Sequence, residues 1–293
     1  MEWLEVSVTS DNEAAEAVAE VLSRYAYHGV VIEAGPEGFN SGPVVVRAYL
    51  PADDRVGTNR RRLEEALWHL GQIWPIGEPA FQPLAEKDWS EAWKERLEVL
   101  HIGAHFVVRP SWREYVPSPD DVVIELDPGQ AFGTGVHPTT QMCLMALEEF
   151  LSSSGDVDVL DLGTGSGILA VGSAKLGARC VLAVDNDPVA VRAAKSNVLE
   201  NGVSDRVRVV QGSLGDVPGN YHLILVNILA NVILEMVAEG LTAHASPDGT
   251  VVVAGILADQ EVAIVSAFAE KGYRPTKRWQ MDDWVCLALN QGS

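Results

Sequence analysis

The sequence feature that most constrains the fold is an apolar segment, residues 157–162, that runs directly into Gly163-Thr164-Gly165-Ser166-Gly167. A helical pattern starts at Ile168, so the segment reads as a strand, a glycine turn and a helix, which is the first unit of an open α/β sheet. Glycines remove Cβ atoms, let the backbone approach a ligand closely and permit positive φ. Because ligands bind at the carboxyl ends of strands in such sheets, this turn is the first candidate binding site.

The rest of the carboxy-terminal region alternates between strands and helices. Strands are predicted at 157–162, 180–185, 206–211, 222–227 and 250–254, and helices at 168–176, 188–200, 230–241 and 259–271. Two final strands, 273–280 and 284–289, are joined by so short a segment that they must be antiparallel. The sequence therefore predicts an α/β, Rossmann-like domain of seven strands over residues 121–293, with an antiparallel last strand.

Two details narrow the choice of ligand. A dinucleotide fingerprint needs glycine at position 168, where Ile168 stands instead. The second strand ends in Asp185, whose carboxylate can accept hydrogen bonds from both hydroxyls of a ribose. Nicotinamide enzymes and S-adenosylmethionine enzymes share this combination, but the loop spacing and the antiparallel tail favour S-adenosylmethionine. The alternative without a ligand is a tight turn with a capping aspartate. For Asp161, holding the methionine amino group and capping backbone N–H groups both remain open.

The fourth predicted strand ends at Asn227, followed by Ile228-Leu229-Ala230. This strand should lie beside the first, which places Asn227 opposite the methyl group. A neutral amide oxygen can align the lone pair of an amine, and in-line methyl transfer depends mainly on positioning. Enzymes that methylate bases or glutamine use Asn-Pro-Pro-Tyr at this place, and its absence argues against those acceptors. Alternatively, Asn227 caps the next helix.

A loop rich in glycine and proline spans residues 127–140 and precedes a helix predicted at 141–151. Its threonine hydroxyls suit helix capping. His137 is a candidate general base, but a lone histidine beside proline in a glycine-rich loop is more often structural.

The amino-terminal region, residues 1–83, has the pattern β-α-β-β-α-β of a small α+β, ferredoxin-like (split βαβ) domain. Strands are predicted at 3–8, 30–33, 44–50 and 73–77, and helices at 11–25 and 59–70. Residues 84–120 read as a linker with a strand at 105–109 and a short helix that carries Trp89 and Trp93. Packing onto a domain is favoured over substrate contact for these two side chains.

The formal net charge of −20 is spread over both regions. Such a chain should repel nucleic acid and anionic membranes and attract basic partners, although an acidic surface also simply aids solubility. Three distant cysteines suggest buried apolar residues in a reducing compartment rather than a metal site. With no signal peptide and no run of about 20 apolar residues, we expect a cytoplasmic protein without membrane contact, acting as a monomer.

Taken together, segment 127–140, segment 161–167, Asp185 and segment 227–230 resemble the bacterial ribosomal protein methyltransferases that modify large-subunit ribosomal protein eleven. The similarity covers nearly the whole chain. It implies S-adenosylmethionine-dependent trimethylation of lysine side chains and of the N-terminal amine on a basic ribosomal protein, recognised by the small domain. The only departure we note is Val136, where the family pattern has threonine.

The resemblance also implies the residues of the site. Carried over by motif, the cofactor contacts would be Thr140, Gly163, Asp185 and Asn227, and the glycine loop adds Gly165 and Gly167. Asn227 is the expected catalytic residue, and no metal is expected.

Two other functions stay open. One is a methyltransferase for lysines of another protein or for a small amine. The other is an RNA-binding module, because split βαβ domains can display RNA. Tyr49 is the only aromatic residue in the strand predicted at 44–50, and residues 1–85 are net acidic, which argues against RNA.

Overall fold

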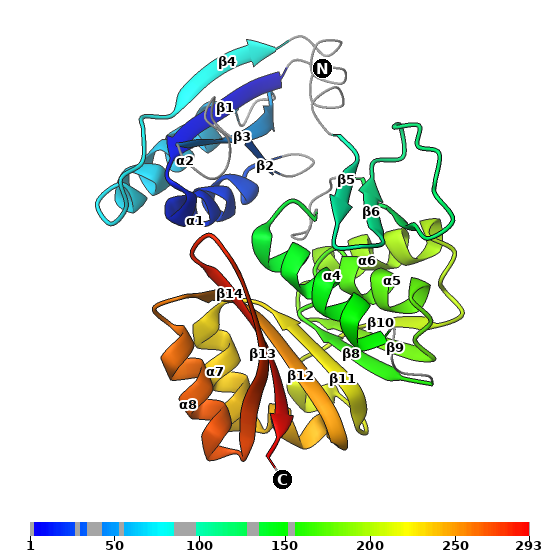
Figure 1. The fold of residues 1–293 in the computed structure, drawn as a ribbon. Coiled ribbons are helices and arrows are strands. Elements are labelled where there is room, and N and C mark those ends of the chain that lie inside the picture. The colour runs from blue at the N-terminus through cyan, green and yellow to red at the C-terminus, as the bar shows by residue number, and fades with distance from the viewer. Residues whose placement is uncertain are drawn as a thin grey trace. The chain divides into compact units, whose positions relative to one another are not determined.

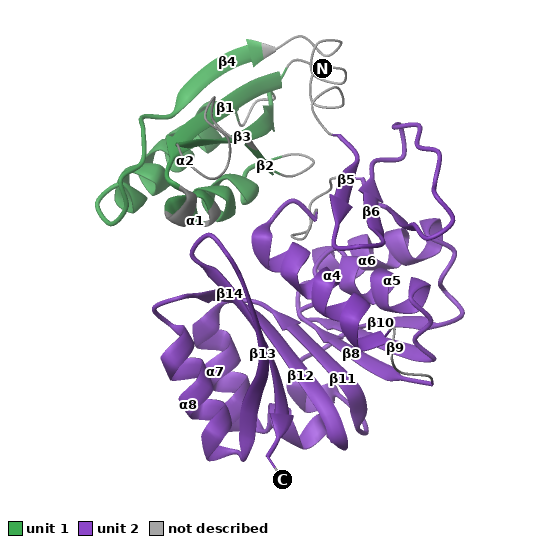
Figure 2. Cartoon of the chain, in the orientation of Figure 1, with its two compact units in different colours: residues 1–97, 128–130 green, residues 98–127, 131–293 purple. Residues whose placement is uncertain are grey.

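The computed structural model describes residues 3–26, 30–33, 43–52, 56–84, 98–127, 135–151 and 156–292. The described residues between 3 and 84 belong to one compact unit, and those between 98 and 292 belong to a second (Figure 2). The helix predicted at 88–97, with Trp89 and Trp93, lies outside the described residues.

The first unit is a four-stranded antiparallel sheet in the order β2-β3-β1-β4, with two helices (Figure 1). Its elements are β1 (Trp3–Ser10), α1 (Asn12–Ser23), β2 (Val30–Glu33), β3 (Val44–Pro51), α2 (Val56–Leu70) and β4 (Ala80–Leu84). The Asp11 side chain caps α1 by accepting a hydrogen bond from Ala14 N, as its position in the sequence predicts. Aliphatic side chains of both helices and of β1 and β3 form one core, which includes Val6, Val18, Leu22, Val46, Leu50, Leu63 and Leu67.

The strand predicted at 73–77 is wrong. Helix α2 continues to Leu70, whose carbonyl accepts hydrogen bonds from the amides of the turn that follows, and only Ile76 forms an isolated bridge to β1. The fourth strand is instead Ala80–Leu84, which pairs with β1 at the edge of the sheet. Pro83 lies within this strand, and an edge strand tolerates proline because one side of its backbone forms no ladder.

The second unit is built on a seven-stranded sheet in the order β10-β9-β8-β11-β12-β14-β13. Its strands are β8 (Asp158–Leu162), β9 (Cys180–Asp185), β10 (Val207–Gln211), β11 (Tyr221–Asn227), β12 (Ala245–Leu257), β13 (Tyr273–Met281) and β14 (Trp284–Gln291). Neighbouring strands from β10 to β12 are parallel, whereas β14 is antiparallel to both β12 and β13.

Helices cover both faces of this sheet. They are α4 (Pro138–Leu151), α5 (Ile168–Lys175), α6 (Pro188–Glu200), α7 (Ala230–Glu239) and α8 (Glu261–Glu270). The first three share one apolar core with the sheet, and α7 and α8 share a second core on its other face (Figure 1). After β8 the chain proceeds outward to β9 and β10, and then returns to place β11 on the other side of β8. The carboxyl ends of β8 and β11 therefore mark the reversal in strand order where open α/β sheets bind ligands.

A small three-stranded sheet completes the second unit. It consists of β5 (Leu100–Ile102), β6 (Phe106–Arg109) and β7 (Val122–Glu125). The carboxylate of Glu148 in α4 accepts hydrogen bonds from three successive backbone amides, those of Ala104, His105 and Phe106. Residues 98–120, which the sequence analysis assigned to the linker, thus contribute β5 and β6 to this unit. None of the described helices is long and apolar enough to cross a membrane.

Candidate functional site

The glycine loop is tied to the end of β9 by the backbone. The amides of Gly163 and Thr164 donate to the carbonyl of Val184, at 2.8 and 3.1 Å. Gly163, Gly165 and Gly167 all have positive φ, at 77°, 56° and 82°. A Cβ on Gly163 would lie 2.6 Å from the Cγ2 atom of Ile228. The glycines therefore serve the conformation and packing of the loop itself.

Asp185 lies at the carboxyl end of β9 and is half-buried. One carboxylate oxygen accepts a hydrogen bond of 2.9 Å from Gly165 N in the glycine loop, and the other accepts one of 3.0 Å from Asp187 N. A carboxylate has about four lone-pair sites, so acceptor capacity remains for the hydroxyls of a ribose. The same side chain thus orients the glycine loop and is suited to bind a nucleoside.

Asp161 lies beneath the loop and is 1% exposed. Its Oδ2 atom accepts hydrogen bonds from Thr164 Oγ1 at 2.5 Å and from Ala170 N at 3.1 Å. Burial, with a smaller contribution from the nearby charge of Asp185, raises the pKa of this carboxyl to about 7 against the opposing effect of the two hydrogen bonds. The structure thus shows Asp161 capping the loop and the first turn of α5, which is one of the two roles left open by the sequence.

Asn227 and Thr140 are brought together although they are far apart in the sequence. Asn227 ends β11, next to β8, and its Nδ2 atom donates to Thr140 Oγ1 in the first turn of α4 at 3.3 Å. Among the described residues, nothing donates a hydrogen bond to the Asn227 amide oxygen. The alternative role as a helix cap is wrong, because α7 begins at Ala230 and its N-cap is Leu229.

Ile228 is enclosed by two glycines. On one side lies Gly163, as described above, and on the other lies Gly255 of β12, where a Cβ would overlap the backbone carbonyl of Ile228. Gly255 has a φ of +82° and lies where the pairing of β12 with β14 shifts in register. This close approach sets the path of the chain just after Asn227. Sequence reasoning missed Gly255, because the predicted strand ends at Ala254, whereas β12 continues through Gly255 to Leu257.

His137 lies at the start of α4. Its ring Nδ1 atom is 2.7 Å from Thr139 Oγ1 and accepts a longer hydrogen bond from Thr139 N, and its ring contacts the edge of Trp284. These contacts fit a capping and packing role for His137. Of the loop predicted at 127–140, residues 128–134 lie outside the described part of the chain. The described residues contain no group of three or more metal-ligating side chains.

Comparison with known proteins decides the family. The family model described as ribosomal protein L11 methyltransferase (PrmA) matches residues 2–292. The chain belongs to this family. Relatives named ribosomal protein L11 methyltransferase include one from Chloroflexus aurantiacus, 43% identical over 97% of both chains, and one from Herpetosiphon aurantiacus, 41% identical over 98% of both chains. The family resemblance inferred from the sequence motifs is therefore confirmed.

A solved structure also supports the fold of this PrmA family member. The ribosomal protein L11 methylase from Lactobacillus delbrueckii subsp. bulgaricus is 35% identical, with a TM-score of 0.63. The match covers 67% of this chain and 100% of that chain. The α/β methyltransferase fold and the assignment to an enzyme family of methyltransferases are thus established for this chain.

Proposed function

We propose that this PrmA family member transfers methyl groups from S-adenosylmethionine to the lysine side chains and the N-terminal amine of ribosomal protein L11. The observation that carries the proposal is the meeting of three features at neighbouring strand ends: the glycine loop after β8, Asp185 at the end of β9 and Asn227 at the end of β11. The substrate follows from its relatives, which are named ribosomal protein L11 methyltransferases.

The described residues fit the cofactor. Asp185 would accept hydrogen bonds from the ribose, next to the backbone of the loop that Gly163, Gly165 and Gly167 hold at positive φ. Thr140 and Asn227 would complete the contacts from the other side of β8. When bound, S-adenosylmethionine supplies a methyl group on a sulfonium, and the protein has only to align the acceptor with it.

Asn227 is the residue proposed to orient the acceptor amine. A free lysine has a pKa of about 10.4, so the amine must lose its proton before its lone pair can attack. The neutral oxygen of Asn227 then accepts a remaining N–H and directs the lone pair toward the methyl group. Because an amide is a weak nucleophile, Asn227 does not compete for the methyl. Burial and a neighbouring positive charge both lower the pKa of an amine, which favours its neutral form.

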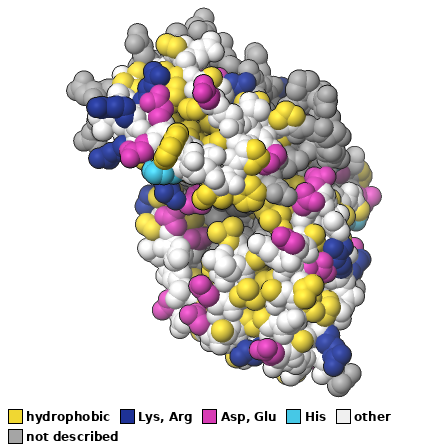
Figure 3. All heavy atoms as spheres, turned by 90° about the vertical axis from the view of Figure 1, so that its left-hand side faces the viewer, with side chains coloured by type: hydrophobic (Ala, Val, Ile, Leu, Met, Phe, Trp, Pro, Cys, Tyr) yellow, Lys and Arg dark blue, Asp and Glu magenta, His cyan; other side chains and the backbone are white. Residues whose placement is uncertain are grey.

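The first unit is proposed to recognise the substrate. Its order of elements, β-α-β-β-α-β, and the sheet order β2-β3-β1-β4 match a ferredoxin-like, split βαβ domain, for which we propose residues 1–83. We propose residues 121–293 as the catalytic domain, and β5 and β6, from the segment 84–120 expected to be a linker, belong to the same compact unit. The net charge of −20 complements a basic ribosomal protein and disfavours direct binding to nucleic acid. On the face drawn in Figure 3, acidic side chains are scattered rather than gathered in one patch. We propose that the enzyme acts as a monomer in the cytoplasm, where ribosomes are assembled.

The proposal is tested by incubating the purified protein with methyl-labelled S-adenosylmethionine and unmodified L11. Mass spectrometry should show added methyl groups on lysines and on the N-terminal amine. Another basic ribosomal protein and a small amine serve as competing acceptors. If the cofactor binds by calorimetry but L11 receives no label, the substrate assignment is wrong; label on the small amine instead would favour the alternative activity.

A further inference from the structure

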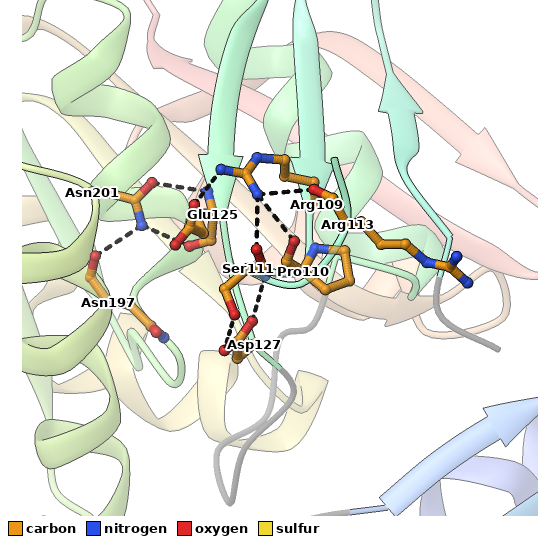
Figure 4. A network of polar contacts seen from close by, with 8 residues as sticks. All are labelled: Arg109, Pro110, Ser111, Arg113, Glu125, Asp127, Asn197 and Asn201. Atoms are coloured by element: carbon orange, nitrogen blue, oxygen red, sulfur yellow. Dashed lines mark hydrogen bonds and ion pairs between the residues drawn. The ribbon is translucent and has the colours of Figure 1, made fainter. Parts of the chain in front are cut away.

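Two asparagines one turn apart, Asn197 near the end of α6 and Asn201 at its C-cap, form hydrogen bonds within the second unit (Figure 4). Asn197 is 7% exposed, and its Nδ2 atom donates a hydrogen bond of 2.7 Å to the carbonyl of Ser166. Ser166 belongs to the glycine loop. A buried side chain of α6 thus holds the backbone of the proposed cofactor loop directly.

Asn201 is the C-cap of α6 and joins this helix to β7. Its Nδ2 atom donates to the carbonyls of Asn197, at 2.8 Å, and of Glu125, at 2.7 Å. Its Oδ1 atom accepts a hydrogen bond of 2.9 Å from Glu125 N. Carbonyls only accept and the amide N–H only donates, so these partners determine the orientation of the Asn201 side chain. Both the amide N–H and the carbonyl of Glu125, the last residue of β7, are therefore hydrogen-bonded to the end of α6. The same helix holds the glycine loop through Asn197.

The end of β7 is itself held in place by further polar contacts (Figure 4). The Glu125 side chain forms an ion pair with Arg109 of β6, and Arg109 also donates to the carbonyls of Ser111 and Arg113. Asp127 accepts two hydrogen bonds of 2.7 Å from the backbone and side chain of Ser111. Helix α6 is therefore held at its carboxyl end by a network rather than by a single contact.

We propose that Asn197 is a positioning residue for cofactor binding, which holds the Ser166 carbonyl and hence the glycine loop in its binding conformation, and that Asn201 supports it by fixing α6 to β7. Neither residue touches the cofactor in this proposal. The inference rests on the proposed function, because it assumes that the loop binds S-adenosylmethionine. Holding the loop before the ligand arrives lowers the ordering cost of binding, so loss of the contact should weaken affinity more than turnover.

The test compares Asn197→Asp with Asn220→Asp. Both changes keep the size of the side chain and remove amide donors to backbone carbonyls, but Asn220 precedes β11 and donates to Ala243 O and Ala245 O at the opposite end of the sheet. Because Asn197 is buried, Asn197→Ala serves as a second variant if the aspartate does not fold. We expect the Asn197 variants to raise the Kd and the KM for S-adenosylmethionine about tenfold, with kcat at saturating cofactor within about twofold of wild type.

Asn201→Asp should act in the same direction with a smaller effect, about threefold in Kd, because it disturbs the loop only through α6. Asn220→Asp should leave the Kd within about twofold of wild type. Unchanged cofactor affinity in a folded Asn197 variant would overturn the proposal, and so would equal losses in the Asn197 and Asn220 variants.

Hydrogen exchange of the free protein separates this inference from the proposed function. Peptides that cover residues 163–168 should exchange faster in the Asn197 variants than in wild type or Asn220→Asp. If wild type fails to bind S-adenosylmethionine, the proposed function is wrong, and the exchange comparison still decides whether Asn197 holds the loop. Equal exchange in all variants contradicts the positioning role.

Discussion

The two ends of the seven-stranded sheet are built on different principles. At the carboxyl ends of β8 and β9, polar side chains bind backbone: Asp185 holds Gly165 N and Asp161 holds Ala170 N, while Asn197 of the adjacent helix holds Ser166 O. At the amino ends, exposed side chains form the polar contacts: Arg179, which is 51% exposed, forms an ion pair with Asp158, and the exposed Asn220 donates to the carbonyls of Ala243 and Ala245.

The difference predicts which substitutions change the function of the site. A side chain that holds backbone in a buried place sets the position of a loop, so its loss changes the geometry of the site. When an exposed ion pair is lost, water solvates the remaining charged group, so stability and activity change little. The predictions below test this contrast between the two ends.

Gly255→Ala should have the largest effect. Its Cβ would overlap the carbonyl of Ile228, and the φ of +82° is strained for alanine, so the chain after Asn227 must move. We expect a loss of methyl transfer of about 100-fold and a loss of about 3 kcal/mol in the free energy of unfolding. Activity assays and denaturant titration measure the two effects.

Gly272→Ala is the matched control, because Gly272 has the same φ of +82° but nothing within 4 Å of its Cβ, and it precedes β13 at the other end of the sheet. This variant should lose stability through strain but keep its kcat. Equal activity in the two variants would show that Gly255 does not position Asn227.

Asp161→Asn should change how stability depends on pH. The pKa of Asp161 is about 7 in the folded protein, above its ordinary 3.8, so its stabilising effect is complete below about pH 4 and is lost as the pH rises through 7. Asparagine can still accept both hydrogen bonds, because both reach the same oxygen, Oδ2. Relative to wild type, the variant should therefore gain about 3 kcal/mol of stability between pH 5 and pH 8.

Denaturant titrations of both proteins at pH 5, 6.5 and 8 measure this gain as a difference, so other carboxyl groups cancel. Parallel curves of stability against pH would mean that Asp161 is ionised in the folded protein throughout this range.

Asp185→Ala should weaken cofactor binding about 30-fold, because the proposed ribose contacts and the hydrogen bond to Gly165 N are lost together. Asp185→Asn retains an acceptor for Gly165 N and should therefore lose less cofactor affinity than Asp185→Ala. Isothermal calorimetry with S-adenosylmethionine is the measurement. Unchanged affinity in the alanine variant would show that Asp185 does not bind the ribose. The proposed contrast between the two ends of the sheet would then fail at this residue.

Arg179→Gln should have the smallest effect. The ion pair with Asp158 raises the pKa of the guanidinium and lowers that of the carboxyl, but the pair is exposed to solvent and screened. We expect the Tm to change by less than about 2 °C and kcat and KM to stay at wild-type values. A clear loss of cofactor affinity would show that the amino ends also control the site.

Most of the second unit could be predicted from the sequence. Its strands are apolar runs between glycine turns, and its helices have regular apolar spacing, so β9 and α6 begin and end at the predicted residues. Other bounds differ slightly. The predicted start of β12, at Thr250, is too late because residues 245–249 show no apolar pattern, and the strand begins at Ala245. In the first unit, β4 was misplaced because Pro83 hides an edge strand.

The supporting contacts of the site could not be predicted. Asp185 and Asn227 stand at strand ends that the sequence marks, whereas the contact between Asn227 and Thr140 joins distant segments that only the fold brings together. Asn197 gave one signal that was overlooked: it is a polar residue on the buried face of α6, between Ala194 and Val198. Such a position requires a hydrogen-bond partner, but the sequence alone does not name it.

The position of β14 has a consequence for how this domain folds during synthesis. Residues 284–291 form an internal strand between β12 and β13, although a ribosome makes them after every other strand of the sheet. Until they emerge, β12 and β13 each lack this neighbour, and the sheet has open edges that can pair with other chains. Completion of the fold is therefore late and non-local. A chain of this kind should depend on chaperones or rapid release more than a domain whose last strand joins an outer edge.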